Sequence, residues 1–283
     1  MTFSIVTLKA FGDFVIACHS ARAARMQSPV AIHHPAVIAG EYMRPLAAAL
    51  GVESEVAFIG SKQWTDVPAV FDVRKRGIIP ALHSLIELRA ILKKFPQDRE
   101  FVFDNAGIRE FFLCPHRKLH HIPKASGNIY LGYQQFFQSA PKPASHPFSF
   151  TSVKKVILIP GSRVASKVIP KSVIDTIHHI LAERGHSLTV VTLEGESIDF
   201  SKGIHSVCIP RTFDNLIATI RASDWMIAAD SLPSHIGEYF QIPQFIFTPH
   251  TINFMLPQSV HESGAWAMFN DSQKLAHWLD AHP

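Results

Sequence analysis

The segment AADSLPSHIGEYFQIPQ at 228–244 interrupts an apolar run with three polar side chains that could do chemistry. Asp230, Ser231 and His235 are residue types that bind a ribose hydroxyl, a phosphate oxygen or a leaving group. The alternative is a polar turn that only caps the following helix, because Asp and Ser are favoured capping residues. The elements that hold these residues decide between the two interpretations.

Strand-like and helix-like segments alternate through the first half of the chain. Short β-rich apolar runs are separated by segments whose apolar residues recur at helical spacing. This alternation predicts a parallel sheet with helices on both faces. The expected strands are at 3–8, 30–34, 55–59 and 100–104, and the expected helices at 14–26, 40–50 and 80–94.

A proline-rich stretch, APKPASHPFSFTS at 140–152, breaks this periodicity and is typical of a linker. The sequence therefore predicts an α/β fold of two facing Rossmann-like domains with parallel sheets, one at 1–145 and one at 146–283. In the second half, the strands and their following turns are expected at 154–162, 186–196, 224–231 and 244–250, and the helices at 170–185, 213–223 and 235–240.

Ligands bind such sheets in the crevice beyond the carboxyl ends of the strands. The loops expected at that edge are 9–13, 160–167, 193–196 and 230–235. The polar side chains of the last of these loops therefore fall where a ligand is expected.

The composition is that of a folded globular protein, with 47% apolar and 18% charged residues among 283. Three widely spaced cysteines offer no disulfide framework and suit a reducing compartment. No apolar run reaches the ~18–20 residues of a membrane span, and no basic leader precedes the first apolar run. We therefore expect a cytoplasmic protein.

The charge is distributed unevenly between the two halves. Residues 1–150 hold 17 Lys and Arg against 11 Asp and Glu, a net charge of +6, whereas the remainder has 10 against 12, a net charge of −2. A basic excess on one half predicts an anionic partner there, such as a phosphate, an acidic sugar or a membrane surface. An ordinary solvated surface is the alternative.

Several binding motifs are absent from the sequence. There is no G-x-G-x-x-G after the first strand, no P-loop and no G-x-S-x-G elbow, so dinucleotide dehydrogenases, P-loop enzymes and α/β-hydrolases lose support. No Asp-x-Asp motif is present that would hold a divalent metal beside a diphosphate. The spacing of Cys114, His116, His120 and His121 also fits no standard metal site, so we expect no bound metal.

Five segments, in order over both halves, resemble glycosyltransferase family nine, the lipopolysaccharide heptosyltransferases. TLKAFGDFVIACHSARAAR resembles the family's strand, Gly-Asp turn and helix, and IPGSRVASKVIP resembles its phosphate-proximal turn, in which P-G-S is followed by a lysine and then W-P. LEGE is similar to G-G-x-x-E, DSLPSH to D-S-G-P-x-H, and YFQIPQFIFTPHT to L-G-x-P-x-x-x-x-F-G-P-T. The chain departs from these patterns at Ile169, Leu232 and Thr248.

The resemblance implies a GT-B architecture, in which the N-terminal domain binds the acceptor and the C-terminal domain binds the nucleotide-sugar donor. It implies inverting, metal-independent transfer of a heptose-type sugar from a donor such as ADP-heptose, with no cofactor and no nucleic-acid partner. The acceptor would be a lipopolysaccharide core or a related acidic glycolipid, reached by peripheral contact with the inner face of the cytoplasmic membrane. Such an acceptor would account for the basic first half.

Two alternatives stay open. One is a catalytically weak relative that binds nucleotide or glycan as a partner module. The other is a different GT-B enzyme, such as a sugar-nucleotide epimerase.

Asp13 is the acid that the resemblance implies as catalytic base, which takes the proton of the acceptor hydroxyl. Its alternative role is an N-cap or first-turn acid of the helix at 14–26. Gly12 is expected to give the backbone a shape that a side chain would block. Lys167 matches the family lysine, whose ammonium can neutralise the leaving diphosphate, and a plain surface lysine is the alternative.

The resemblance also implies donor-binding residues after the first two strands of the second half. Gly161 is expected to shape the P-G-S turn, and Ser162 and Arg163 to contact phosphate or sugar. Glu196 matches the acid that would hold the ribose hydroxyls, with helix capping as its alternative.

The remaining donor residues lie just before, or at the start of, the last two predicted helices. Arg211 and Thr212 lie where the nucleotide base could pack. Asp230 would orient the donor, and His235 would add a hydrogen bond. Ser231 and the backbone amides of a helix beginning at His235 would face the diphosphate, because helix N-termini favour anions.

Overall fold

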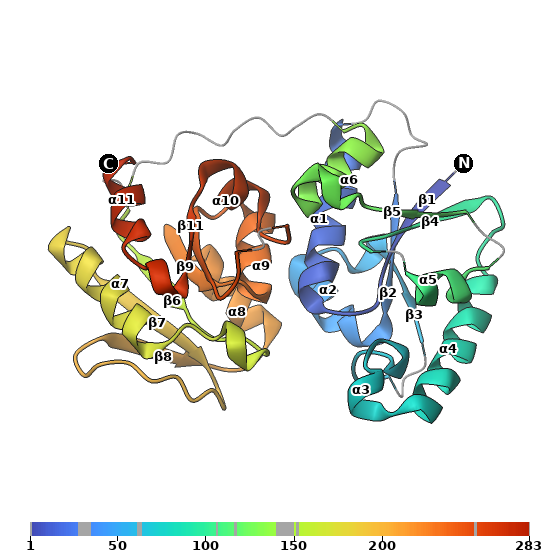
Figure 1. The fold of residues 1–283 in the computed structure, drawn as a ribbon, viewed down its shortest axis with the longest axis horizontal. Helices are drawn as coiled ribbons and strands as arrows, with labels where there is room; N and C mark the ends of the chain where they lie inside the picture. The colour runs from blue at the N-terminus through green and yellow to red at the C-terminus, as the bar shows by residue number, and fades with distance from the viewer. Residues whose placement is uncertain are drawn as a thin grey trace. The chain divides into compact units, whose positions relative to one another are not determined.

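The computed structural model describes residues 2–27, 35–60, 64–105, 107–115, 118–139, 150, 153–251 and 254–282. The chain divides into two compact units, the N-terminal unit at 1–142 and the C-terminal unit at 143–283 (Figure 1). This boundary and the expected one after residue 145 both fall outside the described residues, as does most of the linker predicted at 140–152. The strand predicted at 30–34 also lies outside them.

The N-terminal unit is built on one parallel sheet with the strand order β3-β2-β1-β4-β5 (Figure 1). Its strands are β1 (Thr2–Thr7), β2 (Ala36–Gly40), β3 (Val56–Ile59), β4 (Arg99–Phe103) and β5 (Leu119–His121). Its helices are α1 (Phe11–Gln27), α2 (Arg44–Leu50), α3 (Val73–Arg76), α4 (Ile78–Lys93), α5 (Ile108–Leu113) and α6 (Ile129–Phe137). Because β1 is central, the loop that follows it lies in the middle of the carboxyl edge of the sheet.

The C-terminal unit is built on a second parallel sheet with the order β11-β10-β9-β6-β7-β8. Its strands are β6 (Val156–Ile159), β7 (Leu188–Leu193), β8 (His205–Ile209), β9 (Trp225–Ala229), β10 (Gln244–Thr248) and β11 (Trp266–Met268). Its helices are α7 (Lys171–Glu183), α8 (Phe213–Arg221), α9 (Leu232–Phe240), α10 (Gln258–Ser263) and α11 (Lys274–Asp280).

Apolar spacing explains how the helices cover this sheet. In α7, Ile174, Ile177 and Leu181 recur at helical spacing and are buried. The helix ends just before Gly185, which has the positive φ of +75° that favours glycine after a helix. Strand β9 reads WMIAA and is buried along its whole length, as expected for a central strand covered on both faces.

Both sheets have the strand order of a Rossmann fold, which confirms the prediction of an α/β chain with two parallel sheets. In each unit the first strand is central, the next two extend the sheet on one side, and the chain then returns to the other side. The order reverses between β1 and β4 in one unit and between β6 and β9 in the other. We call these places the two switch points, since loops diverge there and leave a crevice for a ligand.

Two helices begin three residues earlier than predicted. Helix α1 begins at Phe11 rather than at residue 14, and α9 begins at Leu232 rather than at His235. Pro233 explains the second difference, because proline is favoured in the first turn, where its missing N–H is not needed. Strands β2, β5, β8 and β11 and helices α3, α5, α6, α10 and α11 have no counterpart among the predicted elements. Of the helices that the structure describes, none is long and apolar enough to cross a membrane.

Candidate functional site

An ion pair joins the two loops at the switch point of the C-terminal unit. Lys167 ends a short 3-10 turn, Ala165–Lys167, in the loop after β6, and Asp230 directly follows β9. The Lys167 Nζ atom donates to Asp230 Oδ2 at 2.7 Å. The lysine side chain is 30% exposed and the aspartate 11%, so the pair is largely shielded from solvent. The structure thus brings together two residues that the sequence analysis singled out separately.

Ser231 links the same two loops. Its Oγ atom donates to the carbonyl oxygens of Gly161 at 3.3 Å and Ala229 at 3.4 Å. Ser231 occupies the N-cap position of α9, but its side chain makes no capping hydrogen bond. The alternative that this serine hydroxyl caps the helix is therefore wrong.

The N-terminus of α9 lies beside this pair. Because the helix begins at Leu232, the backbone N–H groups at its start belong to Ser231 and Leu232, and the amide of His235 lies inside the helix. The prediction that the amides from His235 onward face a diphosphate is therefore wrong by three residues. The helix N-terminus carries a partial positive charge and favours an anion, so the expected chemistry remains at a shifted position.

His235 is buried in the first turns of α9. Burial lowers the pKa of its imidazole to about 4. The Asp230 carboxylate opposes this decrease, and the nearby Lys167 ammonium adds to it. The ring is therefore neutral at pH 7, with one nitrogen able to donate a hydrogen bond and the other able to accept one.

Glu196 lies against Gly161 at the ends of β7 and β6. Its Oε2 atom accepts a hydrogen bond from the Leu193 N–H at 3.0 Å, and its side chain is 16% exposed. A Cβ atom at Gly161 would lie 2.6 Å from Glu196 Oε2, so only glycine permits this approach. The helix-capping alternative for Glu196 is wrong, because no helix begins between residue 197 and α8 in this fully described stretch.

Arg211 joins the Glu196 turn from the end of β8. Its Nε atom donates to the Glu194 carbonyl oxygen at 2.9 Å, and its Nη2 atom is 3.6 Å from Glu196 Oε1. Thr212 is the N-cap of α8, where its Oγ1 atom accepts from the Asn215 N–H at 3.3 Å. The structure thus gives Thr212 a capping role, and its contact with a donor base stays a prediction.

Ser162 and Arg163 lie in the loop after β6, together with Lys167. The Ser162 Oγ atom accepts from the Val164 N–H at 3.2 Å, and Arg163 is exposed. Neither residue is tied to the Lys167–Asp230 pair by a hydrogen bond that the described part of the chain records, so their contact with phosphate or sugar stays a prediction.

The three departures from the family patterns fit their surroundings. Ile169 is buried, and its N–H donates to the Pro160 carbonyl oxygen at 3.0 Å. Leu232 is helical, so its backbone does not require glycine. Thr248 is buried at the end of β10, where its Oγ1 atom accepts from the His250 N–H at 3.3 Å.

The switch point of the N-terminal unit has a comparable arrangement. Gly12 and Asp13 lie in the first turn of α1, not in a loop before it, so the expected loop position is wrong. The first-turn alternative for Asp13 therefore describes its place correctly, and a catalytic role stays a prediction, because a helix N-terminus also stabilises an ionised carboxylate.

Lys9 is a residue of this site to which the sequence analysis assigned no role. It follows β1, and its Nζ atom is 3.6 Å from Asp104 Oδ1 and 3.3 Å from Glu110 Oε1. Burial of Glu110 would raise its pKa, but hydrogen bonds from the Gly107 and Glu110 backbone and from Lys9 outweigh burial and hold the pKa below its usual value. Burial raises the pKa of the Tyr133 hydroxyl, and the negative charges of Asp104 and Asp13 raise it further.

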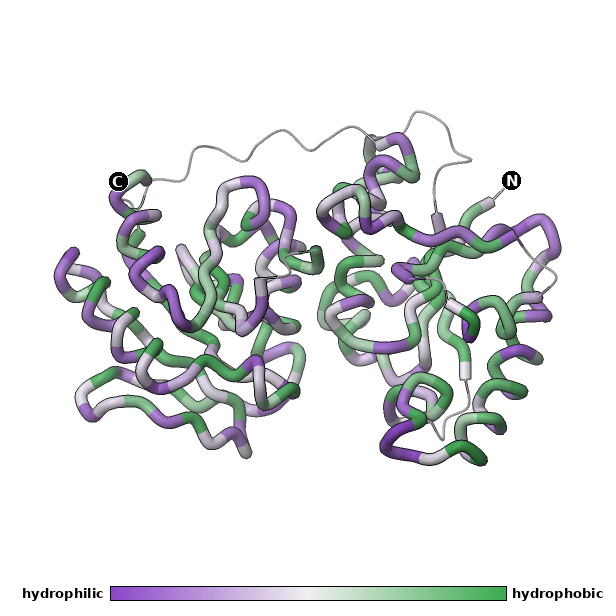
Figure 2. Tube along the Cα trace, in the orientation of Figure 1, coloured by the Kyte–Doolittle hydropathy of each residue, from purple (hydrophilic) through white to green (hydrophobic). Residues whose placement is uncertain are grey.

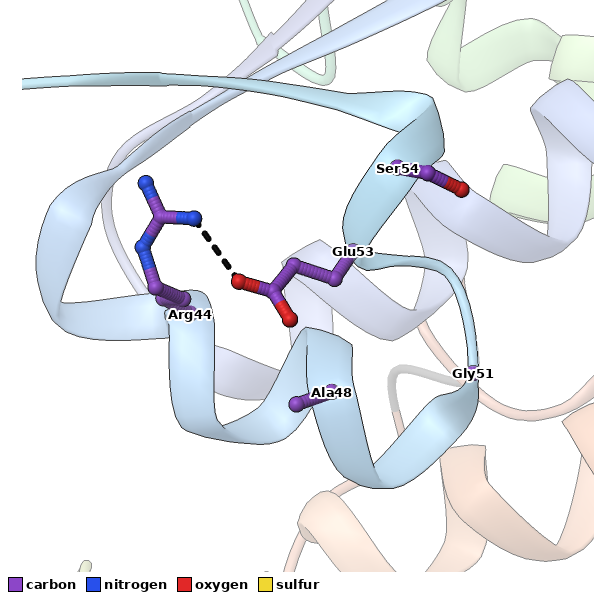
Figure 3. Close-up of a pocket in the computed structure, with 5 residues that line it drawn as sticks. All are labelled: Arg44, Ala48, Gly51, Glu53 and Ser54. Atoms are coloured by element: carbon purple, nitrogen blue, oxygen red, sulfur yellow. Dashed lines mark hydrogen bonds and ion pairs between the residues drawn. The ribbon is translucent and has the colours of Figure 1, made fainter.

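A surface depression in the N-terminal unit lies away from these residues in the sequence. It is lined by Arg44, Ala48, Gly51, Glu53 and Ser54. Figure 3 shows the Arg44 guanidinium directed at Glu53, to which it donates at 2.8 Å, and Arg44 also donates to Glu41 at 2.6 Å. Its charge is balanced by two acids, which makes it a poor anion site. Elsewhere among the described residues, no group of three or more His, Cys, Asp or Glu side chains is placed to hold a metal ion.

No protein-family model matches the chain, and no curated protein matches it in sequence. Solved structures match it in fold. Heptosyltransferase WaaC from E. coli, solved with ADP, has a TM-score of 0.61 and 11% identity over 100% of both chains. E. coli ADP-heptose lipopolysaccharide heptosyltransferase II has a TM-score of 0.58 and 13% identity over 99% of this chain and 98% of that one. A glycosyl transferase family 9 protein from Veillonella parvula has a TM-score of 0.58 and 12% identity over 94% and 86%.

These matches concern the fold, because the identities are low. The chain has the two-domain α/β architecture of the heptosyltransferases, so the predicted GT-B fold is confirmed. The resemblance to glycosyltransferase family nine is likewise confirmed for the fold.

Proposed function

We propose that this chain is an inverting glycosyltransferase that moves a heptose-type sugar from a nucleotide-sugar such as ADP-heptose to a lipopolysaccharide core or a related surface glycan. The observation that carries this proposal is the Lys167–Asp230 pair, which lies at a switch point beside the N-terminus of α9. The fold of heptosyltransferases over the full length of the chain supports it, and one of those enzymes was solved with ADP-2-deoxy-2-fluoro heptose, at a TM-score of 0.56 and 12% identity over 98% and 99% of the two chains.

The C-terminal unit would supply the donor chemistry. The Lys167 ammonium and the N–H groups at the start of α9 would neutralise the charge that builds on the leaving diphosphate, without a metal ion. Asp230 would orient both the lysine and the donor. Glu196 would accept hydrogen bonds from the ribose hydroxyls, and neutral His235 would donate one to the diphosphate or the sugar.

The N-terminal unit would supply the acceptor chemistry. The acceptor oxygen attacks the anomeric carbon of the sugar while the bond from that carbon to the diphosphate oxygen breaks. The electron pair of the broken bond leaves with the diphosphate, and the proton of the acceptor hydroxyl goes to the Asp13 carboxylate. A single displacement of this kind inverts the anomeric configuration.

The proposed acceptor is an acidic glycolipid, which places the reaction at the inner face of the cytoplasmic membrane. The net charge of +6 in residues 1–150 supports an anionic acceptor or surface for this half.

A thermal-shift screen with ADP-, GDP-, UDP- and CMP-sugars, followed by mass spectrometry of a lipid A core acceptor, tests the proposal. A ligand that binds only the native state raises the melting temperature. We expect a shift with an ADP-sugar in the presence of a chelator, and an acceptor product heavier by one sugar. A donor isomerised without acceptor would identify an epimerase, and donor binding without turnover would identify a catalytically weak relative. Either result would contradict the proposal.

A further inference from the structure

The helices α3, α4 and α5 of the N-terminal unit leave a large apolar surface uncovered. Of the eleven large hydrophobic side chains that are exposed in the described part of the chain, eight belong to these three helices. We call this surface the α4 face, and it consists of Val73, Ile78, Ile79, Leu82, Ile86, Ile108, Phe111 and Phe112.

Helix α4 carries two apolar stripes. Ala81, Leu88 and Leu92 face the core and are buried. A second stripe of Ile79, Leu82 and Ile86 has helical spacing on the outer side, with exposed fractions of 82%, 54% and 70%. Figure 2 shows hydrophobic residues along much of this helix. A helix that is apolar on both sides is normally covered on both sides.

Helix α5 extends the same surface. Ile108, Phe111 and Phe112 are 79%, 62% and 52% exposed. The helix packs against α4, and its Leu113 belongs to the same core cluster as Leu88. The two exposed sets are therefore neighbours. Together they form a contiguous apolar surface, whereas an ordinary surface exposes hydrophobic residues singly.

Basic residues flank the apolar surface. Residues 73–94 hold six Lys and Arg, which are Arg74, Lys75, Arg76, Arg89, Lys93 and Lys94, and Glu87 as their one acid. The net charge of +5 in this short stretch accounts for most of the +6 of residues 1–150. Two of these cations have acidic neighbours, Arg76 with Asp66 and Lys75 with Asp72 at 4.0 Å. The Lys75 side chain is nevertheless 82% exposed.

The α4 face begins near the carboxyl edge of the sheet. Phe71, just before α3, lies with its ring centre 5.6 Å from the Nζ atom of Lys9. In the first turn of α5, the Arg109 Nη1 atom donates to the Val70 carbonyl oxygen at 3.3 Å. The start of the apolar surface is therefore adjacent to the switch point that carries Asp13 in the same unit.

We propose that the α4 face docks on the surface of a membrane that contains anionic lipids. Large apolar side chains beside Lys and Arg are the composition of helices that lie in the membrane interface, where the apolar groups enter the acyl boundary and the cations meet anionic headgroups. Charge argues against a second copy of this chain, because a two-fold pairing of this face would bring two net positive surfaces together. The inference rests on the proposed function in one respect, since a membrane-held glycolipid acceptor explains why docking occurs beside Asp13.

Co-sedimentation of the full chain with vesicles tests this inference, with neither donor nor acceptor present. We expect binding to vesicles of 30% phosphatidylglycerol in phosphatidylcholine, and weaker binding to pure phosphatidylcholine or in 0.5 M salt. Ile79→Asp combined with Leu82→Asp should reduce the partition coefficient at least tenfold. Arg74→Ala and Lys93→Ala should each reduce it roughly fivefold, because a cation near an anionic surface contributes about 1 kcal/mol.

Met26→Asp combined with Val207→Asp is the matched control, since both residues are exposed, at 75% and 40%, and lie outside the α4 face. The control should bind vesicles like the unchanged chain. Equal binding by the Ile79→Asp, Leu82→Asp variant, or no binding to any vesicle, would overturn the inference. A dimer in ultracentrifugation that this variant abolishes would assign the face to a second copy. A large drop in its melting temperature would show that another part of the chain covers the face, and this result would also overturn the inference.

Calorimetry of ADP on the same variants separates this inference from the proposed function. Vesicle binding without nucleotide binding would contradict the glycosyltransferase proposal and leave membrane docking in place. Nucleotide binding without vesicle binding would overturn docking alone.

Discussion

The two switch points have the same construction but a different charge balance. In each, a lysine from the loop after the first strand meets an acid that follows the fourth strand: Lys9 with Asp104, and Lys167 with Asp230. Lys167 has this one carboxylate at 2.7 Å, whereas Lys9 also has Glu110 at 3.3 Å. The fold thus decides where a lysine and an acid meet, and the additional side chains decide what the site can bind.

This difference suggests different chemistry in the two units. At the C-terminal switch point the lysine charge faces one acid, and the N-terminus of α9 adds partial positive charge, which suits a diphosphate. At the N-terminal switch point, two acids balance Lys9, and Asp13 is a further acid in the first turn of α1. Three acids against one lysine leave this site net negative even beside the N-terminus of α1, so it is better suited to accept a proton than to hold an anion. The basic excess of that unit lies beside the α4 face instead.

The largest effect is expected at the proton-accepting site. Asp13→Asn keeps the shape of the side chain and its place in the first turn of α1 but removes the base. We expect kcat to fall by ~10²–10⁴, the usual contribution of a positioned general base. Donor affinity by calorimetry and the melting temperature should stay near those of the unchanged chain. Turnover at close to the unchanged rate would reduce Asp13 to a first-turn acid.

Acid denaturation should separate the two switch points by pH. The folded pKa of His235 is about 4 and its unfolded value about 6.5, so the unfolded state binds more protons between these values and stability falls as pH drops through this window. The expected loss is about 3 kcal/mol. The folded pKa of Glu110 is lowered from 4.5, so the stability it adds is lost only as pH falls below that value.

Urea denaturation from pH 7.5 to 3.5 measures how His235 and Glu110 each contribute to the pH dependence of the free energy of unfolding. His235→Gln should flatten the stability curve between pH 6.5 and 4, and Glu110→Gln should flatten it only below pH 4.5. His179→Gln is the control, because its side chain is 73% exposed. A His235→Gln curve parallel to that of the unchanged chain would contradict the burial of a neutral imidazole beside Lys167.

A smaller effect is expected where Glu196 lies against Gly161. The Cβ atom of Gly161→Ala would force the Glu196 carboxylate to move, so we expect donor affinity to fall roughly fivefold, about 1 kcal/mol. In a Glu196→Ala background the same substitution should have little effect, because the carboxylate with which it clashes is gone. Calorimetry with ADP on the four variants gives the coupling. Additive effects would mean that the glycine acts independently of Glu196.

Much of the fold could be predicted from sequence, because buried central strands such as β6 and β9 are apolar runs and α7 has a clear amphipathic spacing. The edge strands β5, β8 and β11 could not, although the edge strand β3 was predicted. Strand β8 reads HSVCI and is largely exposed, and β11 has three residues, so neither shows a clear alternation. The sequence predicts the start of α9 three residues too late, because the polar residues after β9 are typical of a loop, although Leu232 and Pro233 can open a helix.

The sites were predictable where a local pattern marks them and not where contact is long-range. Asp13, Lys167 and Asp230 belong to short segments that resemble family motifs. Lys9 gave no signal, because its partners Asp104 and Glu110 lie about a hundred positions away and only the strand order brings them together. Family patterns also could not show that Thr212 caps α8.

Calorimetric titration of the full chain with ADP, without added metal, tests most directly the claim that the diphosphate binds at the C-terminal switch point. The two lysines are matched in position, so Lys167→Ala and Lys9→Ala form a controlled pair. We expect Lys167→Ala to weaken ADP binding roughly 10- to 100-fold, since a hydrogen bond to a charged group contributes about 1.5–3 kcal/mol. Lys9→Ala should leave the affinity unchanged. Equal weakening by the two substitutions, or a loss with Lys9→Ala alone, would contradict the account.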